Sequence, residues 1–319
     1  MKKLLVVISV LLVFLNGIYA QEVKVNNGKL TIDGCLWGQY YNIKSTTSNI
    51  TTTVSSFSRR AAFLGLTANL NNWALARMYL DLSDIAGKPA YDLYATVKAG
   101  PASLTFGQFK LPLGVEVLTK PENLELIEYS LIGRSTTTQP IRTPKGTRDI
   151  GIQAAYKHPL FDVTAALVNG EGRNVLSDID NNKNFAGRVI VRPLQKSSIF
   201  AGVNIYLGKY IENFHRIGAE FNYSVSPIIL KIEFLNTKDG NLKGNGYYAQ
   251  AGYNWKSLQP MFRYSSFKYE NIETMNEYVI GLNIRPLNDN LKVMLNYKNE
   301  KTSSTNKQTG FIGQLQIAF

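Results

Sequence analysis

From residue 29 onward, the chain is built of short segments that alternate apolar with polar or small residues and are separated by turn residues. In the last segment, Leu315, Ile317 and Phe319 share one face of a strand, whereas Gln314 and Gln316 share the other. A strand with one apolar and one polar face suits a barrel wall between lipid and water. A soluble sandwich can show this alternation but rarely ends on an aromatic residue. The pattern therefore predicts an all-β protein, a transmembrane antiparallel β-barrel.

We expect sixteen strands, an even number, as a barrel with both termini on one side of the membrane requires. Their approximate ranges are 29–43, 57–70, 72–82, 91–99, 101–109, 147–157, 159–169, 184–193, 197–208, 213–224, 226–236, 245–254, 257–268, 276–286, 290–299 and 309–319.

The connections between these strands alternate in length. The tight ones are 71–72, 100–101, 158–159, 193–197, 224–227, 256–257 and 286–290. The longer, polar ones are 44–56, 83–90, 110–146, 170–183, 208–212, 237–244, 269–275 and 300–308. Short periplasmic turns opposite longer external loops are typical of outer-membrane barrels. This sorting favours a barrel over a soluble sandwich.

The first twenty residues have the layout of a secretory signal peptide: two lysines, an apolar run over residues 4–15 and a small residue at Ala20. The run is shorter than the about 20 residues that span a membrane as a helix. We expect cleavage after Ala20 and a single domain over 21–319 in the outer membrane of a Gram-negative bacterium. The only cysteine, Cys35, excludes an internal disulfide and is expected to pack in its strand.

One face of each strand must suit lipid, so the other face lines the lumen. Without Lys2 and Lys3, 33 basic residues remain against 23 acidic ones. The basic residues that alternation turns inward are Arg59, Arg77, Lys98, Arg188, Arg192, Arg216, Lys231, Arg263, Arg285, Lys292 and Lys298. The inward acidic residues are Asp81, Asp92, Asp149, Asp162, Glu220, Glu233 and Glu277. The predicted lumen is polar, and its charge balance is basic.

One connection, residues 110–146, is far longer than the others. A connection of this length in a compact fold is normally functional or disordered. Its middle, residues 123–132, is too apolar for an external loop, and helical structure is plausible there. We expect this connection to fold inward and narrow the wide channel of a sixteen-stranded barrel. A hydrophobic plug and an external lid are the alternatives.

Basic side chains in a narrow pore replace part of an anion's hydration shell and exclude cations. Arginine also donates two parallel hydrogen bonds to phosphate-like oxyanions. We therefore predict passive diffusion of small hydrophilic solutes with a preference for anions, among them phosphate or related oxyanions. The candidate pore-lining residues are Arg59, Arg77, Arg188 and Arg216 on the wall and Lys110 and Lys120 on the long connection.

Two alternative functions remain open. If the lumenal bases pair with wall carboxylates, the chain is a general or oligosaccharide porin without ion selectivity. Inward tyrosines would then stack on the solute; the candidates are Tyr79, Tyr94, Tyr206 and Tyr248. The other alternative is a surface-binding outer-membrane protein, which the mostly short, polar external loops do not favour.

Several ordered motifs resemble the phosphate-selective porin O and P family. They are SRRA over 58–61, GQFKLPLGVEVLT over 107–119, IEYSL over 127–131, RDIG over 148–151 and FAGR over 185–188. The resemblance implies a sixteen-stranded porin that forms homotrimers, in which arginines and lysines guide anions to a constriction. The residues that match the family's basic positions are Arg59, Arg60 and Lys110.

No enzymatic constellation is visible. A hydrolase needs a nucleophile, a base and an orienting group in one place, but His158 and His215 fall at opposite ends of the predicted barrel. The acidic residues show no metal-ligand spacing, so no cofactor is expected. Export, and the lack of a basic run with interleaved aromatics, argue against nucleic acid as a partner.

Overall fold

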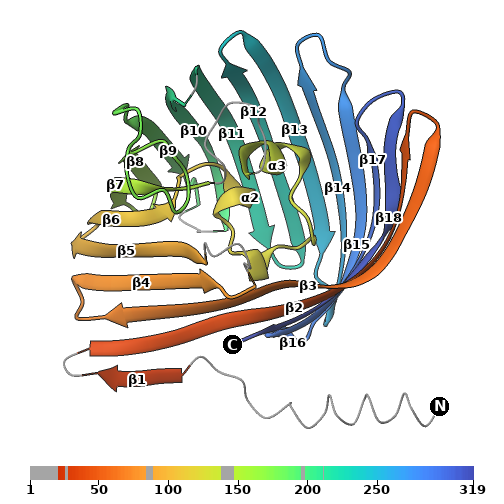
Figure 1. The fold of residues 1–319 in the computed structure, drawn as a ribbon. Coiled ribbons are helices and arrows are strands. Elements are labelled where there is room, and N and C mark those ends of the chain that lie inside the picture. The colour runs from red at the N-terminus through yellow and green to blue at the C-terminus, as the bar shows by residue number, and fades with distance from the viewer. Residues whose placement is uncertain (1–20, 26–27, 84–88, 138–146, 195–197, 211) are drawn as a thin grey trace.

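A ring of antiparallel strands forms the wall of the molecule (Figure 1). The computed structural model describes residues 21–25, 28–83, 89–137, 147–194, 198–210 and 212–319. Seventeen strands are hydrogen-bonded in one sheet. Sixteen of them close the ring, because β9 pairs with β10 and β18 pairs with β2; the short β1 pairs with β2. The prediction of a sixteen-stranded antiparallel barrel is confirmed.

The strand that precedes the ring is β1 (Gln21–Val25), and the first half of the ring consists of β2 (Gly28–Thr47), β3 (Ile50–Asn69), β4 (Ala74–Asp81), β5 (Ala90–Ala99), β6 (Ala102–Lys110), β7 (Arg148–Lys157), β8 (Phe161–Val168) and β9 (Asn184–Val191). The second half consists of β10 (Ile199–Lys209), β11 (Asn213–Val225), β12 (Ile228–Asp239), β13 (Leu242–Tyr253), β14 (Leu258–Tyr269), β15 (Met275–Ile284), β17 (Leu291–Lys301) and β18 (Asn306–Ala318). The short β16 (Pro286–Asp289) lies between β15 and β17.

The expected strand ranges agree with the structure to within a few residues, except at two hairpins. The connections expected over 44–56 and 237–244 are strand for most of their length. The first contains runs of threonine and serine, which favour strands. Ser48 and Asn49 take positive φ values of 47° and 72°, and Gly240 takes 59°, so tight turns suffice at both places. The strands β1 and β16 were not predicted from the sequence.

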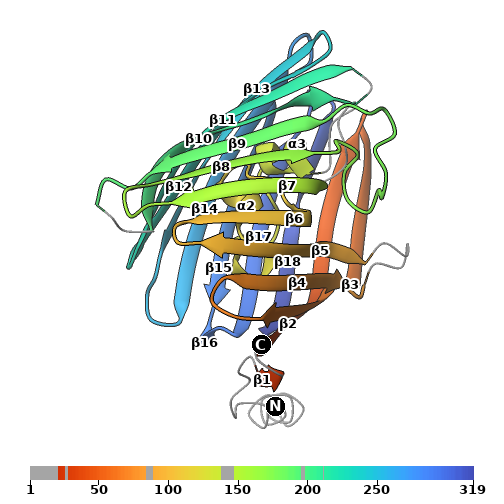
Figure 2. The same cartoon turned by 90° about the vertical axis from the view of Figure 1, so that its left-hand side faces the viewer.

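The two ends of the barrel differ. We call the end that holds the C-terminal Phe319 and the β5–β6 and β7–β8 turns the turn end, and the opposite end, where β6 leaves the wall, the loop end (Figures 1 and 2). On β11, Arg216, Glu220 and Asn222 are buried, whereas Ile217 is exposed on the other face. The predicted alternation of lumenal and outward side chains therefore holds there.

The alternation is interrupted once on β3, by a β-bulge. The strand register passes from Trp37↔Ala61 to Gly38↔Arg59, which leaves Arg60 without a partner. One extra residue reverses the faces of the residues beyond it. Trp37 is buried inside the ring with Ala61, so Gly38 and Arg59 lie on the outer face.

Arg59 therefore does not face the lumen, and its predicted orientation is wrong. It lines a hollow on the outside of the barrel together with Leu36 and Leu315, which are 55% and 41% exposed. Arg60 is the neighbour whose charge reaches the lumen, where it acts on Glu128 and Tyr129.

Residues 111–137, here called the lumen segment, lie inside the ring (Figures 1 and 2). The segment contains α2 (Val115–Leu118), the 3-10 helix η1 (Pro121–Asn123) and α3 (Leu131–Thr137). The long connection was expected to fold inward, and residues 111–137 do so. Residues 138–146 of the same connection lie outside the described residues. No helix among the described residues is long and apolar enough to cross a membrane. The expected signal peptide over residues 1–20 also lies outside the described residues.

Candidate functional site

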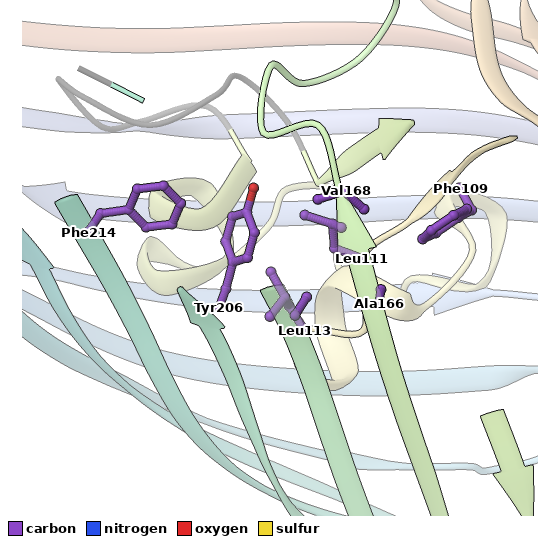
Figure 3. Packing of buried hydrophobic residues seen from close by; sticks show 8 residues of the cluster. Phe109, Leu111, Leu113, Ala166, Val168, Tyr206 and Phe214 are labelled. Atoms are coloured by element: carbon purple, nitrogen blue, oxygen red, sulfur yellow. The ribbon is translucent and has the colours of Figure 1, made fainter. Parts of the chain in front are cut away.

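The lumen segment begins with apolar packing against the wall (Figure 3). As the chain leaves β6, alternate residues of the segment bury their side chains against inward residues of β8, β9, β10 and β11. The cluster consists of Phe109, Leu111, Leu113, Ala166, Val168, Ala186, Tyr206 and Phe214. Burying a large aliphatic or aromatic side chain contributes about 1.5–3 kcal/mol, so this cluster holds the start of the segment firmly to one side of the lumen.

Gly114 allows the segment to come close to β12, the next strand of the wall. Its φ of 68° lies in the left-handed region, and a Cβ there would come within 2.2 Å of Glu233 Oε2. Glu233, on β12, accepts a hydrogen bond from the Glu116 N–H at 2.7 Å and one from the Tyr248 hydroxyl at 2.6 Å. The glycine therefore lets a wall carboxylate bind the first turn of α2.

Arg263, on β14, is the central anchor of the segment. Its side chain is 1% exposed. It donates to Glu116 Oε1 at 3.0 Å, to the Glu128 carbonyl at 2.8 Å and to Glu277 Oε1 at 3.1 Å. Glu116 also accepts hydrogen bonds from the Ser130 N–H and hydroxyl. One buried guanidinium thus joins both halves of the segment to the wall.

A second ionic network holds α3. Arg134 donates to Glu277 at 2.7 Å and to Glu300 at 2.9 Å, and Lys298 lies 2.8 Å from both Glu128 and Glu300. Burial raises the pKa of the Glu128 carboxyl, but the positive charge and hydrogen bond of Lys298 outweigh that effect, so the pKa is lowered. Glu128 is therefore ionised at neutral pH and binds the segment to β17.

We expect acid to weaken this attachment. A carboxyl whose pKa is lower in the folded state stabilises that state above its unfolded pKa, which is about 4.3 for glutamate. This stabilisation disappears as the pH falls from that value through the lowered pKa of Glu128. Single-channel recordings should show more current fluctuation below about pH 4, and Glu128→Gln should fluctuate already at neutral pH. Equally quiet currents from wild type and variant at every pH would contradict this prediction.

Lysines of the wall also hold the middle of the segment. Lys231 pairs with Glu125, and Lys292 donates to the carbonyls of Glu122 and Leu124 at 2.9 and 3.0 Å. The next two residues of the segment, Leu126 and Ile127, pack against inward residues of β12, β14, β15, β17 and β18. Four basic residues that were expected to line the lumen are thus occupied in holding the segment: Lys231, Arg263, Lys292 and Lys298.

An open cavity remains on the other side of the segment. It lies against the wall formed by β4 to β9, the strands that face the viewer in Figure 2. Its volume is roughly 580 Å³. It reaches from Lys110 and Arg148, where β6 and β7 meet the long connection, to Lys98 and Lys157 beside the turns at the turn end. Basic side chains dominate its lining: Arg77, Lys98, Lys110, Lys120, Arg148, Lys157 and Arg188. The acidic residues of the lining are Asp92 and Asp162.

The arginines of this lumen cavity are held by carboxylates. Arg188 forms two hydrogen bonds of 2.7 Å with Glu220, in the parallel geometry that fixes a guanidinium plane. Arg77 is held in the same way by Asp33, with both distances 2.9 Å. Arg148 lies 2.6 Å from Asp92. These pairs offset part of the arginine charge and fix where the rest of it lies.

The lysines are less compensated. Within the described part of the chain, Lys98 and Lys157 form no ion pair, and both side chains are exposed. The Lys120 side chain is 56% exposed and lies 3.7 Å from both Asp33 and Glu122. Lys110 donates to the Thr119 carbonyl at 2.8 Å, which ties the end of β6 to the C-terminal end of α2. The cavity therefore has a basic excess even after its paired carboxylates are counted.

The six predicted site residues separate into three groups. Arg77, Arg188, Lys110 and Lys120 line the cavity together. Arg59 lies outside the barrel, as described above. Arg216 is 3% exposed and is neutralised by Asp239 at 2.6 Å, away from the cavity lining. Its inward orientation is as predicted, but its charge is compensated by a carboxylate of the neighbouring strand and does not reach the cavity.

Sequence reasoning missed three cavity residues as site candidates. Lys98 was placed inward but not singled out. Lys157 follows Gln153 and Ala155 on one face of β7, so strand alternation could have found it. Arg148 had no such signal, because alternation lapses where β7 joins the long connection: Arg148 and Asp149 are both buried.

Comparisons with known proteins agree with this architecture. A family model, "Phosphate-selective porin O and P", matches residues 31–198 and 191–319. None of the curated protein sequences matches the chain. Among solved structures, the anion-selective porin from Comamonas acidovorans is 11% identical, with a TM-score of 0.70 over 92% of this chain and 100% of that one.

Two further solved structures share the barrel. OpdQ of Pseudomonas aeruginosa is 12% identical, with a TM-score of 0.54 over 92% of this chain and 98% of that one. The trimer form of OmpT, an outer membrane protein of Vibrio cholerae, is 10% identical, with a TM-score of 0.55 over 91% and 99% of the two chains. At these identities the likeness concerns the fold.

Proposed function

Because this chain belongs to the phosphate-selective porin O and P family and is a porin of the Gram-negative outer membrane, we propose that it conducts small hydrophilic anions through the lumen cavity. The observation that carries this proposal is the composition of the cavity lining, in which seven basic side chains face two acidic ones. The carboxylates that pair with the lining from behind, Asp33, Glu122 and Glu220, leave a basic excess.

The mechanism is electrostatic. An anion that enters at the turn end first meets the exposed ammonium groups of Lys98 and Lys157 and then passes between the lumen segment and the arginines of the wall. In a confined space each positive charge lowers the energy of an anion and raises that of a cation. The guanidinium planes, fixed by Asp33 and Glu220, can donate the remaining N–H groups to an oxyanion. This arrangement supports phosphate or a related oxyanion as a preferred solute.

The lumen segment is proposed as the constriction, since it fills the other half of the lumen through its anchors on β11 to β18. The remaining expectations stand as parts of the same proposal: cleavage of a signal peptide after Ala20, and a homotrimer in the outer membrane. By analogy, the anion selectivity of the Comamonas acidovorans porin supports the anion preference, and the trimer form of OmpT supports the homotrimer. The family and the fold are those of channels, and we propose passive diffusion without catalysis.

The competing function, an oligosaccharide porin, needs aromatic rings free to stack on a sugar. Tyr206 and Tyr248 are buried in clusters that hold the lumen segment, and Tyr79 is 3% exposed and stacked on Phe63. Tyr94 lines the cavity and is half-buried, so part of its ring is exposed. The tyrosines therefore support a sugar path less well than the basic side chains support an anion path.

The test is the reversal potential of the refolded mature protein in a planar bilayer under a potassium chloride gradient, repeated with phosphate. We expect a potential of the sign for anion flow and a chloride current that decreases as phosphate is added. A potential of the sign for cation flow would refute the anion preference, and a chloride current that phosphate does not change would refute the oxyanion site.

A further inference from the structure

The outer face of the barrel carries a row of lysines at the loop end. On β2, β10, β12, β13, β14, β17 and β18 the outward residue near that end is a lysine. These residues, here called the lysine belt, are Lys44, Lys209, Lys238, Lys243, Lys268, Lys301 and Lys307. All except the half-buried Lys238 are exposed.

Acidic residues on these and the adjoining strands do not share that face. Among the described residues of β2, β11, β12, β15 and β17, the acidic side chains take the inward positions of their strands, where most are buried in the ionic contacts described above. They are Asp33, Glu220, Glu233, Asp239, Glu277 and Glu300. Charge is therefore sorted across the wall, with carboxylates inside and ammonium groups outside.

The belt lies at a fixed height above a row of outward aromatic side chains. On six strands the lysine follows an aromatic residue at a spacing of four residues towards the loop end; the pairs are Tyr40 and Lys44, Phe234 and Lys238, Tyr247 and Lys243, Tyr264 and Lys268, Tyr297 and Lys301, and Phe311 and Lys307. The rings contact one another across strands, with centroids 6.1 Å apart for Tyr247 and Tyr264 and 5.0 Å apart for Tyr297 and Phe311. They form a girdle of the kind that marks the membrane interface.

This spacing sets the depth of the lysines in the membrane. Four residues of strand span about 13 Å, which is about 9 Å along the membrane normal at a tilt of about 45°. The polar headgroup region is about 5–8 Å thick on each side of the hydrocarbon core. With the aromatic rings at the inner boundary of that region, the lysine backbones lie at about its outer edge, and their long side chains reach back to the headgroups.

Two cross-strand pairs within the belt are unfavourable by themselves. Lys238 lies directly opposite Lys243, and Lys301 lies directly opposite Lys307. Like charges in this position destabilise a sheet. Within the described residues none of these four lysines forms an ion pair with a carboxylate. Glu270, in the loop after β14, donates its backbone N–H to the Lys243 carbonyl, and the charge of Lys301 acts on the loop residue Glu273. An anion from outside the chain would stabilise both lysine pairs.

We propose that the lysine belt binds phosphorylated headgroups of the lipids that surround the loop end of the barrel. A phosphomonoester carries more than one negative charge and three acceptor oxygens, so it can bridge the two ammonium groups of a Lys–Lys pair. The aromatic girdle beneath the belt favours a lipid over a free ion, because it gives the acyl chains an apolar surface directly below the bound headgroup.

The test counts bound lipids by native mass spectrometry of the full-length mature barrel in detergent, with phosphatidic acid or phosphatidylcholine added. Wild type should retain phosphatidic acid preferentially. Each lysine near an anionic lipid surface changes binding about fivefold, so the variant Lys238→Gln/Lys243→Gln/Lys301→Gln/Lys307→Gln should lose at least tenfold of this preference. The matched control, Lys98→Gln/Lys157→Gln, removes lysines from the lumen and should retain it.

Three outcomes would overturn the proposal: an unchanged preference in the four-lysine variant, an equal loss in the lumenal control, or displacement of phosphatidic acid by inorganic phosphate at equal concentration. If the four-lysine variant does not fold, the salt dependence of wild type decides, because an electrostatic preference weakens as ionic strength rises and a salt-independent one would refute the belt. Anion selectivity plays no part in this measurement, so its outcome is separate from that of the proposed function.

Discussion

The substitution Lys98→Glu/Lys120→Glu/Lys157→Glu is expected to reverse the sign of the reversal potential, from anion flow to cation flow. All three lysines line the lumen cavity and are exposed, so their replacement leaves the buried ionic contacts of the lumen segment intact. Lys98 and Lys157 form no ion pair among the described residues, and the Lys120 ammonium group lies 3.7 Å from both Asp33 and Glu122. The arginines of the cavity then add little net positive charge, because each of them is paired with a carboxylate.

The expected change is large even when solvent screening is strong. At a distance of about 6 Å in the dielectric of bulk water, one unit charge changes the energy of an ion by about 0.7 kcal/mol, a factor of about three. Each substitution changes the charge by two units, so the three together should lower the anion-to-cation permeability ratio by at least about tenfold. The effect should be greatest at low salt.

Arg59→Glu is the matched control for this experiment. It makes the same charge reversal at a residue that belongs to the family's basic motif but lies on the outer face of the bulge. It should leave the potential unchanged. A reversal of sign in Arg59→Glu, or an unaltered potential in the triple variant, would mean that the lumen cavity is not the path of the ion.

Arg263→Met is expected to detach the lumen segment and increase the single-channel conductance. The substitution leaves the buried Glu116 carboxylate without its arginine, leaves Glu277 with Arg134 as its remaining arginine, and removes the hydrogen bond to the Glu128 carbonyl. Removing one partner of a buried ion pair destabilises a protein by about 3–5 kcal/mol. Because these bonds join the segment to the wall, the loss falls on the attachment of the segment more than on the barrel strands. The open current should become larger and noisier.

The design includes a control and a rescue. Arg192→Met makes the same substitution in a pair with Asp162 whose side chains are 14% and 18% exposed, and it should leave the conductance nearly unchanged. Adding Glu116→Gln to Arg263→Met should restore part of the quiet behaviour, because it removes the carboxylate that has lost its arginine. Quiet current of wild-type size from Arg263→Met would show that the apolar packing alone holds the segment.

Strand alternation predicted the barrel, its strand number and the lumenal face of most strands. It could do so because the period of two within a strand depends only on neighbouring residues and can be read directly from the sequence. Arg59 shows where this reasoning ends. The bulge on β3 inserts one residue between two arginines that are alike, and nothing in the local sequence distinguishes the one that turns outward from the one that turns inward. Only the register with β2 settles it.

The roles of the inward basic residues were not predictable for a different reason. Arg263 and Lys98 look alike in a list of lumenal cations, yet one is buried against Glu116 and the other lines an open cavity. The difference depends on which side of the lumen the segment occupies, and that is fixed by contacts between residues more than a hundred positions apart. The apolar middle of the long connection indicated that it packs inward, but not against which strands.

The position of Ile127 links the interior of the molecule to the order in which it assembles. Its side chain packs with Met294 of β17 and Ile312 of β18, and Tyr41 and Ile43 of β2 pack against the same cluster. The lumen segment therefore crosses the seam at which the first and last strands of the ring meet. The cluster around Ile127 is complete only when β18 has reached β2, and contacts between residues this far apart in the sequence form slowly. Closure of the ring therefore also completes the packing of the middle of the lumen segment.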